Sequence, residues 1–385
     1  MTLPEKSGPT VAHILGSVDR GGVEMRMLEV ARALPATGPK LTMVTLTGRE
    51  GSLAGDYRAA GATIVPLRLS SPWFALKFVR FLRGNRIKVV HSHVHLASGF
   101  ILALATLGGA RIRIANFSSD GRPRAEQSLP ARAKYAVMRW LLNQFATDII
   151  GIAPSTLTVA WKKDWANDPR CRVLMTGFDL EKFSSTGTTD IRDELGIAPA
   201  EPLILHIGRA DIPTKNRDGA IRFFGEYAKA HPRGALVFVG RDGADEVQSA
   251  ANRSRWLSIT EQLGVTDRVH YAGERMDVPD LLASADLLLF TSTLEGLPGV
   301  LVEACAAGTP VIASDVAGAV HLAQHVGGIQ LLSLQAAISV WADAIADALR
   351  DRPTPETREL ARRKLYGSEL DIEVAVGHFR RLWCA

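Results

Sequence analysis

The stretch Phe290–Pro310 reads FTSTLEGLPGVLVEACAAGTP and joins an apolar run to a segment of small residues. The apolar run, Leu287–Phe290, predicts a buried strand, and Val300–Ala307 predicts a helix. The turn between them, Gly296 to Gly299, leaves backbone N–H groups free at the helix start. Such a glycine turn before a helix is typical of an anion site, most often for phosphate.

Two carboxylates lie in the same stretch, Glu295 in the turn and Glu303 eight positions later in the helix. A carboxylate on the helix can accept hydrogen bonds from sugar hydroxyls, so the combination with phosphate suggests a sugar nucleotide. An acid/base pair of the glycosidase type is the alternative. We disfavour it because a spacing across a turn and a helix start does not determine the distance between the carboxylates.

The same strand–turn–helix order recurs along the chain. Val11–Leu15 predicts a strand, Gly21-Gly22 a turn and Val23–Leu34 a helix. Ser184–Asp190, SSTGTTD, predicts a linker, after which the alternation restarts. We therefore predict the α/β class with two tandem Rossmann-like domains that face each other across a cleft, spanning 1–185 and 186–365, and a terminal helix in 366–385.

Composition restricts the function classes. The chain has 385 residues, 46% of them hydrophobic, and a net charge of +5, which suits an anionic ligand. No Lys/Arg run is long enough for a nucleic-acid arm, and the three cysteines show no metal-ligand spacing, as expected in a reducing cytoplasm. Leu96–Ala110 is too short to span a bilayer, and the N-terminus does not resemble a signal peptide. We expect a soluble or peripheral protein.

Basic residues at predicted strand ends suit a diphosphate. Arg209 and Lys215 lie six positions apart in one loop, and a guanidinium with an ammonium can hold two phosphates. Gly21 and Gly22 allow the backbone to approach a phosphate. The alternatives are solvated loop charges and an ordinary tight turn.

Three histidines alternate at strand spacing in His91-Ser92-His93-Val94-His95. A metal site is one interpretation, but we favour a hydrogen-bonding cluster because no carboxylate or cysteine partner lies nearby. The chain contains no GxxxxGK[ST] motif, which argues against a P-loop NTPase.

Together these segments resemble the retaining glycosyltransferases of family 4, which have the GT-B fold. The strongest match is STLEGLPGVLVEA, Ser292–Ala304, which resembles the family's E-x7-E signature and is nearest to capsular and exopolysaccharide members. The segments GGVE, HSHVH, MTGFDLEKF, IGRADIPTKN and GERMDVPDLLASADLLLFTS follow in the family's order.

The resemblance implies a role for each site residue. The donor diphosphate would contact Gly21 and Gly22 from the acceptor-side N-terminal domain and Arg209 and Lys215 from the sugar-nucleotide-binding C-terminal domain. Glu303 would bind the ribose, the backbone around Arg275 and Met276 the base, and Glu295 the transferred sugar, with the N–H groups of Gly299, Val300 and Leu301 on phosphate or sugar. No metal or other cofactor would be needed. The C-terminal helix would pack toward the N-terminal domain.

One departure affects the catalytic set. Members similar to this chain often carry histidine where it has Asn116, a position that faces the donor sugar. Asparagine can still hydrogen-bond but carries no charge. This difference keeps open a non-catalytic sugar-nucleotide-binding partner of another transferase. A sugar-nucleotide epimerase is the other alternative, disfavoured because those enzymes lack the E-x7-E arrangement followed by GTPVIASD.

The resemblance also implies the substrates. We expect transfer of a hexose or amino-hexose from a nucleotide sugar, UDP-linked rather than GDP-linked, to a hydroxyl of a saccharide, lipid-linked saccharide or small natural-product acceptor. Ser71–Lys88 is apolar and basic, which suggests contact with an anionic membrane surface as well as an ordinary sheet-covering helix. Further positive charge comes from Arg111, Arg113, Arg122, Arg124, Arg132, Lys134 and Arg139.

Overall fold

The computed structural model describes residues 8–119, 129–184 and 191–385. The chain divides into two compact units, Met1–Asp179 with Gly367–Ala385 and Leu180–Tyr366. Residues 185–190 of the predicted linker lie outside the described part, as do Arg122 and Arg124. Within the described part, no helix is long and apolar enough to cross a membrane.

The N-terminal unit contains a seven-stranded parallel sheet in the order β3-β2-β1-β4-β5-β6-β7. Its strands are β1 (Thr10–Leu15), β2 (Lys40–Thr45), β3 (Thr63–Pro66), β4 (Val89–Ser92), β5 (Ile112–Phe117), β6 (Asp148–Gly151) and β7 (Cys171–Val173). Its helices are α1 (Gly22–Ala33), α2 (Ala54–Ala59), α3 (Phe74–Gly84), α4 (Ser98–Gly108), α5 (Leu129–Phe145), α6 (Pro154–Thr156) and α15 (Ile372–Trp383).

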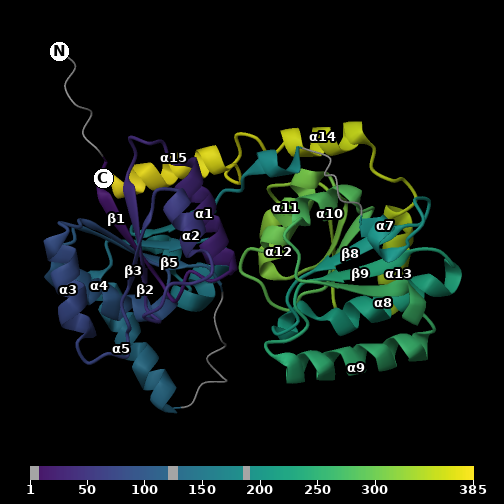
Figure 1. The fold of residues 1–385 in the computed structure, drawn as a ribbon, viewed down its shortest axis with the longest axis horizontal. Coiled ribbons are helices and arrows are strands. Elements are labelled where there is room, and N and C mark those ends of the chain that lie inside the picture. The colour runs from purple at the N-terminus through teal and green to yellow at the C-terminus, as the bar shows by residue number, and fades with distance from the viewer. Residues whose placement is uncertain (1–7, 120–128, 185–190) are drawn as a thin grey trace. The chain divides into compact units, whose positions relative to one another are not determined.

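Alternate residues of β1 face two cores, as the period of a strand requires. Val11 and Leu15 pack into the core that includes α1 and α15, whereas Ala12 and Ile14 pack into the core that includes α3 and α4. Helices therefore cover both faces of this sheet, and α15, the last helix of the chain, lies along α1 (Figure 1). Burial on both faces explains why most residues of the strands are apolar.

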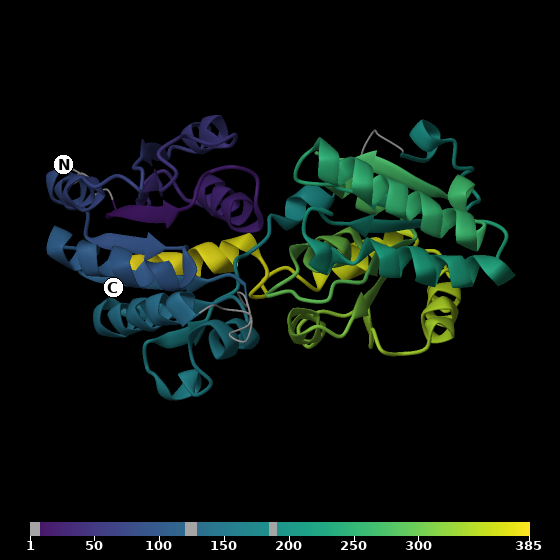
Figure 2. The ribbon, with the colours of Figure 1, turned by 90° about the horizontal axis from the view of Figure 1, so that it is seen from below.

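The C-terminal unit contains a six-stranded parallel sheet in the order β10-β9-β8-β11-β12-β13. Its strands are β8 (Leu203–Ile207), β9 (Ala235–Val239), β10 (Val269–Gly273), β11 (Leu287–Phe290), β12 (Val311–Ser314) and β13 (Ile329–Leu332). Its helices are α7 (Ile191–Leu195), α8 (Arg217–Ala230), α9 (Glu246–Leu263), α10 (Val278–Ser284), α11 (Gly299–Ala307), α12 (Ala317–Ala323), α13 (Ile338–Ala348) and α14 (Pro355–Arg363). Helices cover both faces of this sheet as well (Figure 2).

Both sheets reverse their strand order once, and this confirms the predicted class of two Rossmann-like domains. The reversal falls between β1 and β4 in the first sheet and between β8 and β11 in the second. Loops that leave adjacent strands at such a point diverge and open a crevice at the carboxyl ends of the strands. The loop after β8 contains Lys215, and the loop after β11 contains Glu295.

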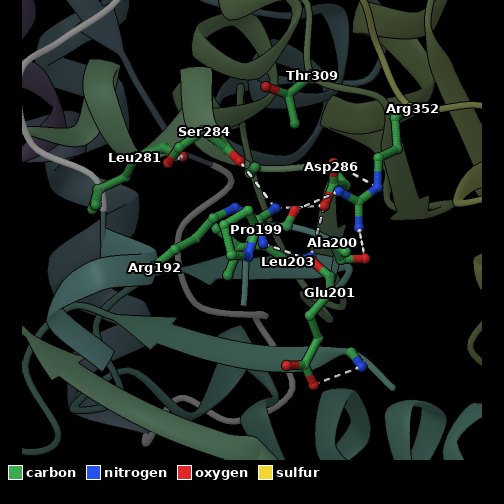
Figure 3. A network of polar contacts seen from close by, with 12 residues as sticks. Arg192, Pro199, Ala200, Glu201, Leu203, Leu281, Ser284, Asp286, Thr309 and Arg352 are labelled. Carbon is green, nitrogen blue, oxygen red and sulfur yellow. Dashed lines mark hydrogen bonds and ion pairs between the residues drawn. The ribbon is translucent and has the colours of Figure 1, made fainter. Parts of the chain in front are cut away.

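The opposite, amino-terminal edge of the second sheet is held by a buried polar network around Asp286 (Figure 3). The Asp286 carboxylate accepts hydrogen bonds from Arg192 at 2.7 Å and from the backbone N–H of Leu203 at 2.8 Å. Arg352 lies 3.6 Å from the same carboxylate and donates to the carbonyls of residues 199 and 200. The network links α7 and the segment after α13 to the starts of β8 and β11, so it supports the sheet away from the predicted site.

Candidate active site

The loop that carries Lys215 is tied to the end of the neighbouring strand β11. Asn216 adopts a left-handed conformation at φ 52°, accepts a hydrogen bond from the Gly219 N–H and donates to the Thr291 carbonyl. The Thr291 hydroxyl donates to the Asn216 carbonyl at 2.9 Å, and the buried His206 ring lies 3.1 Å from the Lys215 carbonyl. These bonds position Lys215 relative to the turn after β11.

Lys215 and Glu295 meet although they lie far apart in sequence. The Lys215 Nζ is 2.5 Å from Glu295 Oε1, and the two side chains are only 19% and 17% exposed. The Ser292 hydroxyl donates to the same carboxylate oxygen at 3.0 Å. Sequence reasoning identified the ion pair's members but not their contact, and it missed Ser292 and Asn216.

Arg209 lies in the same loop as Lys215 but has a different partner. Its guanidinium is 3.6 Å from Asp211, whose carboxylate also pairs with Arg241 at 2.5 Å. These cations hold the pKa of Asp211 below its ordinary value, although burial opposes them. The Arg209 side chain is 40% exposed, which leaves it accessible to an anion.

A buried ion pair that sequence reasoning missed braces this loop. Arg217 bonds to Asp242 at 2.7 Å, and its guanidinium also donates to the carbonyls of Gly208 and Gly240. The guanidinium stacks over the rings of Phe238 and Trp256. Arg217 therefore holds the backbone immediately before Arg209 against the end of β9.

The start of α11 differs from the prediction in one detail. The N-cap is Pro298, which offers no side-chain hydrogen bond, and a helix start directs its first N–H groups away from the helix. The N–H groups of Gly299 and Val300 fit this geometry, but Leu301 donates its N–H to the Pro298 carbonyl at 3.1 Å. That bond would have to break before Leu301 could bind an anion. Glu303 lies half-buried within α11.

The predicted base-binding residues occupy the turn between β10 and α10. Arg275 forms hydrogen-bonded ion pairs with Asp277 and Glu194, which raise its pKa. Its guanidinium is therefore engaged, and only the backbone of this turn fits the predicted contact with a base. Met276 is 66% exposed.

The N-terminal unit contributes Gly21 and Gly22 at the start of α1. Gly21 is the N-cap and provides no side-chain hydrogen bond. A Cβ at Gly21 would lie 2.3 Å from a carboxylate oxygen of Glu24, whereas a Cβ at Gly22 would meet open space. A side chain at position 21 would only displace the flexible end of the Glu24 side chain, while position 22 is open to a ligand.

Asn116 contacts a buried cluster of histidines. Its amide nitrogen is 3.0 Å from His93 Nδ1, and His93 Nε2 is 3.0 Å from His13 Nδ1. His91 completes the cluster, because His13, His91 and His93 each offer a ring nitrogen within 4.8 Å of the others, the arrangement in the described residues that could hold a metal. His95, predicted to share this face, instead bonds to Ser119 at 2.9 Å and lies outside the cluster. The sequence offered no signal for His13.

Two parallel Rossmann-like sheets with a charged site at a strand-order reversal fit the architecture of the GT-B glycosyltransferases. Residues 20–182 match the model of Glycosyltransferase Family 4, and residues 187–364 match the model of Glycosyl transferases group 1. The chain belongs to the family 4 type of GT-B glycosyltransferases.

Named relatives and solved structures agree with this assignment. The chain is 27% identical to the glycosyltransferase EpsF of Bacillus subtilis over 88% of this chain and 87% of that protein. It is 26% identical to the capsular polysaccharide biosynthesis glycosyltransferase CapH of Staphylococcus aureus over 80% and 81%. The crystal structure of Anabaena HepE in complex with UDP has a TM-score of 0.78 at 18% identity and covers 97% of this chain and 98% of its own. That structure supports the fold.

Proposed function

We propose that this glycosyltransferase moves a hexose or amino-hexose from a UDP-linked donor to an acceptor hydroxyl with retention of anomeric configuration. The observation that carries the proposal is the Lys215–Glu295 pair, which lies at the strand-order reversal in the same loop region as the start of α11. A cation suits the phosphates of a nucleotide sugar, and a carboxylate suits its hydroxyls. HepE, which shares the fold, binds UDP and UDP-glucose.

Lys215 and Arg209 bind the donor diphosphate in this proposal, with the N–H groups of Gly299 and Val300. Gly21 and Gly22 are the phosphate-binding candidates of the N-terminal unit. Glu295 accepts hydrogen bonds from the transferred sugar, and Glu303 accepts them from the ribose. Fixed positive charge at the diphosphate stabilises the negative charge that develops on the leaving nucleotide. No metal is required, because these groups supply that stabilisation.

The proposed reaction breaks the bond between the anomeric carbon and the diphosphate oxygen. The acceptor hydroxyl forms the new bond on the same face of the sugar, and its proton passes to the departing phosphate. The nucleoside diphosphate leaves with both bonding electrons. Lys215 is well placed for this step because hydrogen bonds to its carbonyl and from Asn216 hold its backbone, and Glu295 holds its ammonium.

A donor assay tests the proposed function. We expect UDP-glucose or another UDP-sugar to raise the melting temperature more than GDP-sugars, and the wild-type enzyme to release UDP slowly without acceptor. Glu295→Ala should abolish this release, while Glu226→Ala, a change of a carboxylate on α8 that contacts Lys229, should not. Tight nucleotide binding with no release under any acceptor would favour a non-catalytic binding partner instead.

We propose a saccharide on a lipid carrier as the acceptor and a peripheral position at the cytoplasmic membrane surface. CapH carries a name of capsular polysaccharide biosynthesis, and α3 exposes Leu76 to 49% alongside Lys77 and Arg80, with Trp73 63% exposed just before the helix. Two of the predicted surface charges do not contribute to this membrane contact. Arg113 donates to the last carbonyl of α5, and Arg139 packs on Trp161.

Liposome flotation tests the membrane contact. We expect the protein to float with vesicles that contain anionic lipid, and to lose this binding in high salt, because exposed cations near the surface provide the attraction. Trp73→Ala with Lys77→Ala should reduce flotation several-fold. Equal recovery with neutral and anionic vesicles would contradict the proposal.

A further inference from the structure

A chain of buried polar contacts runs through the N-terminal unit from its last helix to Asn116. Trp383 Nε1 lies 3.4 Å from His91 Nδ1, and the ring centroids of His91 and His13 are 5.0 Å apart. His13 then contacts His93, and His93 contacts Asn116, each at 3.0 Å. All five side chains are at most 6% exposed. We call these five residues, Trp383, His91, His13, His93 and Asn116, the histidine relay.

The proton positions in the histidine relay follow from its first member. An indole N–H only donates, so His91 Nδ1 must accept and His91 must carry its proton on Nε2. Burial lowers the pKa of His13, His91 and His93, so each ring carries a single proton at neutral pH. With a single proton on each ring, the two remaining hydrogen bonds, His13–His93 and His93–Asn116, can be donated either away from Asn116 or toward it.

In the first direction the Asn116 N–H donates to His93, and His93 donates to His13. Three buried atoms then have no hydrogen-bond partner among the described residues: His13 Nε2, His91 Nε2 and Asn116 Oδ1. The two ring nitrogens are both donors in this arrangement, so they cannot satisfy each other. Each unpaired buried group destabilises the fold by about as much as a lost hydrogen bond.

In the second direction the Asn116 oxygen accepts from His93, and His93 accepts from His13. Rotation of the amide by half a turn provides this oxygen without other movement, because the two ends of an amide have nearly the same shape. His13 Nε2 then carries no proton and is complementary to the N–H of His91, which one buried water could bridge to it at the observed ring separation. Within the histidine relay, only the Asn116 NH2 group then has no partner among the residues that the structure describes.

We infer that the hydrogen bonds of the histidine relay are all donated in one direction, from Trp383 through the three histidines to Asn116. This direction holds the asparagine amide with its NH2 group toward the ligand. Given the proposed function, this group donates a hydrogen bond to an oxygen of the donor sugar. The histidines and Trp383 are positioning residues, and the last helix of the chain, α15, thereby sets the polarity of a side chain on β5. A metal at the same place is disfavoured, because the Trp383 N–H leaves His91 Nε2 protonated.

Nitrogen NMR of the histidine rings tests the direction without any turnover. We expect His13 and His93 to carry their proton on Nδ1 and His91 on Nε2, with each signal assigned by a single His→Gln variant. Protons on Nε2 of His13 and His93 would overturn the inference, as would a stoichiometric metal ion in the purified protein. This result does not depend on the proposed function.

Kinetics test the link to Asn116. Trp383→Phe removes one N–H and should lower kcat about tenfold with little change in the donor KM. The same change in an Asn116→Ala background should cost nothing further, because coupled residues are not additive. Asn116→Asp, which offers only acceptors, should be as slow as Asn116→Ala.

Trp341→Phe is the matched control. Trp341 is fully buried in the other unit and donates its N–H to the Ser333 carbonyl at 3.0 Å. It should lower the melting temperature as Trp383→Phe does and leave kcat unchanged. Additive losses for Trp383→Phe and Asn116→Ala, or wild-type turnover of Asn116→Asp, would overturn the proposed direction. If the wild-type protein shows no transfer activity, that result counts against the proposed function instead.

Discussion

Replacement of Lys215 by methionine should lower kcat for sugar transfer by about 10³-fold, the loss typical when one preorganised group that stabilises developing negative charge is removed. The change removes the ammonium and leaves the Glu295 carboxylate, which is only 17% exposed, without its cation. That carboxylate would then repel the diphosphate as well. Steady-state kinetics with the donor identified by thermal shift would measure the loss.

Two further variants separate charge loss from structural damage. Lys229→Met removes an exposed ammonium that contacts Glu226 on α8, and it should leave kcat unchanged. Lys215→Met combined with Glu295→Gln should bind UDP more tightly than Lys215→Met alone, because the uncompensated carboxylate is gone. If Lys215→Met turns over the donor within threefold of wild type, Lys215 does not stabilise the leaving group.

The free energy of unfolding should fall steeply as the pH drops below about 6.5, the ordinary pKa of histidine. Burial lowers the pKa of His93 to about 3 and that of His206 to about 3, the latter with help from the nearby Arg217 charge. At neutral pH both residues are uncharged in the folded and the unfolded chain, so they contribute no difference. Below 6.5 the unfolded chain takes up protons that the folded chain refuses, and stability is lost down to about pH 3.

Each of these two histidines should lower the free energy of unfolding by roughly 2.5 kcal/mol at pH 4.5, since one pKa unit corresponds to about 1.4 kcal/mol. His13 and His91 act in the same direction. Urea unfolding between pH 7 and pH 4.5 would measure the effect, above the range where carboxylates with lowered pKa, such as Asp168, begin to titrate. His206→Gln should flatten the slope for the C-terminal unit, and an unfolding free energy independent of pH over this range would contradict the prediction.

The local sequence pattern was sufficient to predict the helices and strands and the chemical type of the candidate site residues. The apolar run Leu287–Phe290 forms β11, and the small-residue segment after it forms α11, because burial on both faces and close helix packing leave few other residue types possible. Glycine and proline marked the turn between them. The alternation of such units was enough to predict two parallel sheets, since parallel strands need a crossover helix.

Contacts between distant segments could not be predicted in the same way. Lys215 meets Glu295 only because β8 and β11 are neighbours at the strand-order reversal, which sequence order does not specify. The Arg217–Asp242 pair was missed for the same reason.

The sequence alone therefore determined the fold class, the residue types of the site and the family, because these depend on local periodicity and on ordered motifs. The tertiary structure decided which charges pair, that the Leu301 N–H is already engaged, and that His13 and Trp383 lie beside the HSH segment. Those features depend on sheet register, which places His13 opposite His91, and on the return of the last helix to the first sheet. Such long-range pairing is set by packing of the whole unit and leaves no local pattern in the chain.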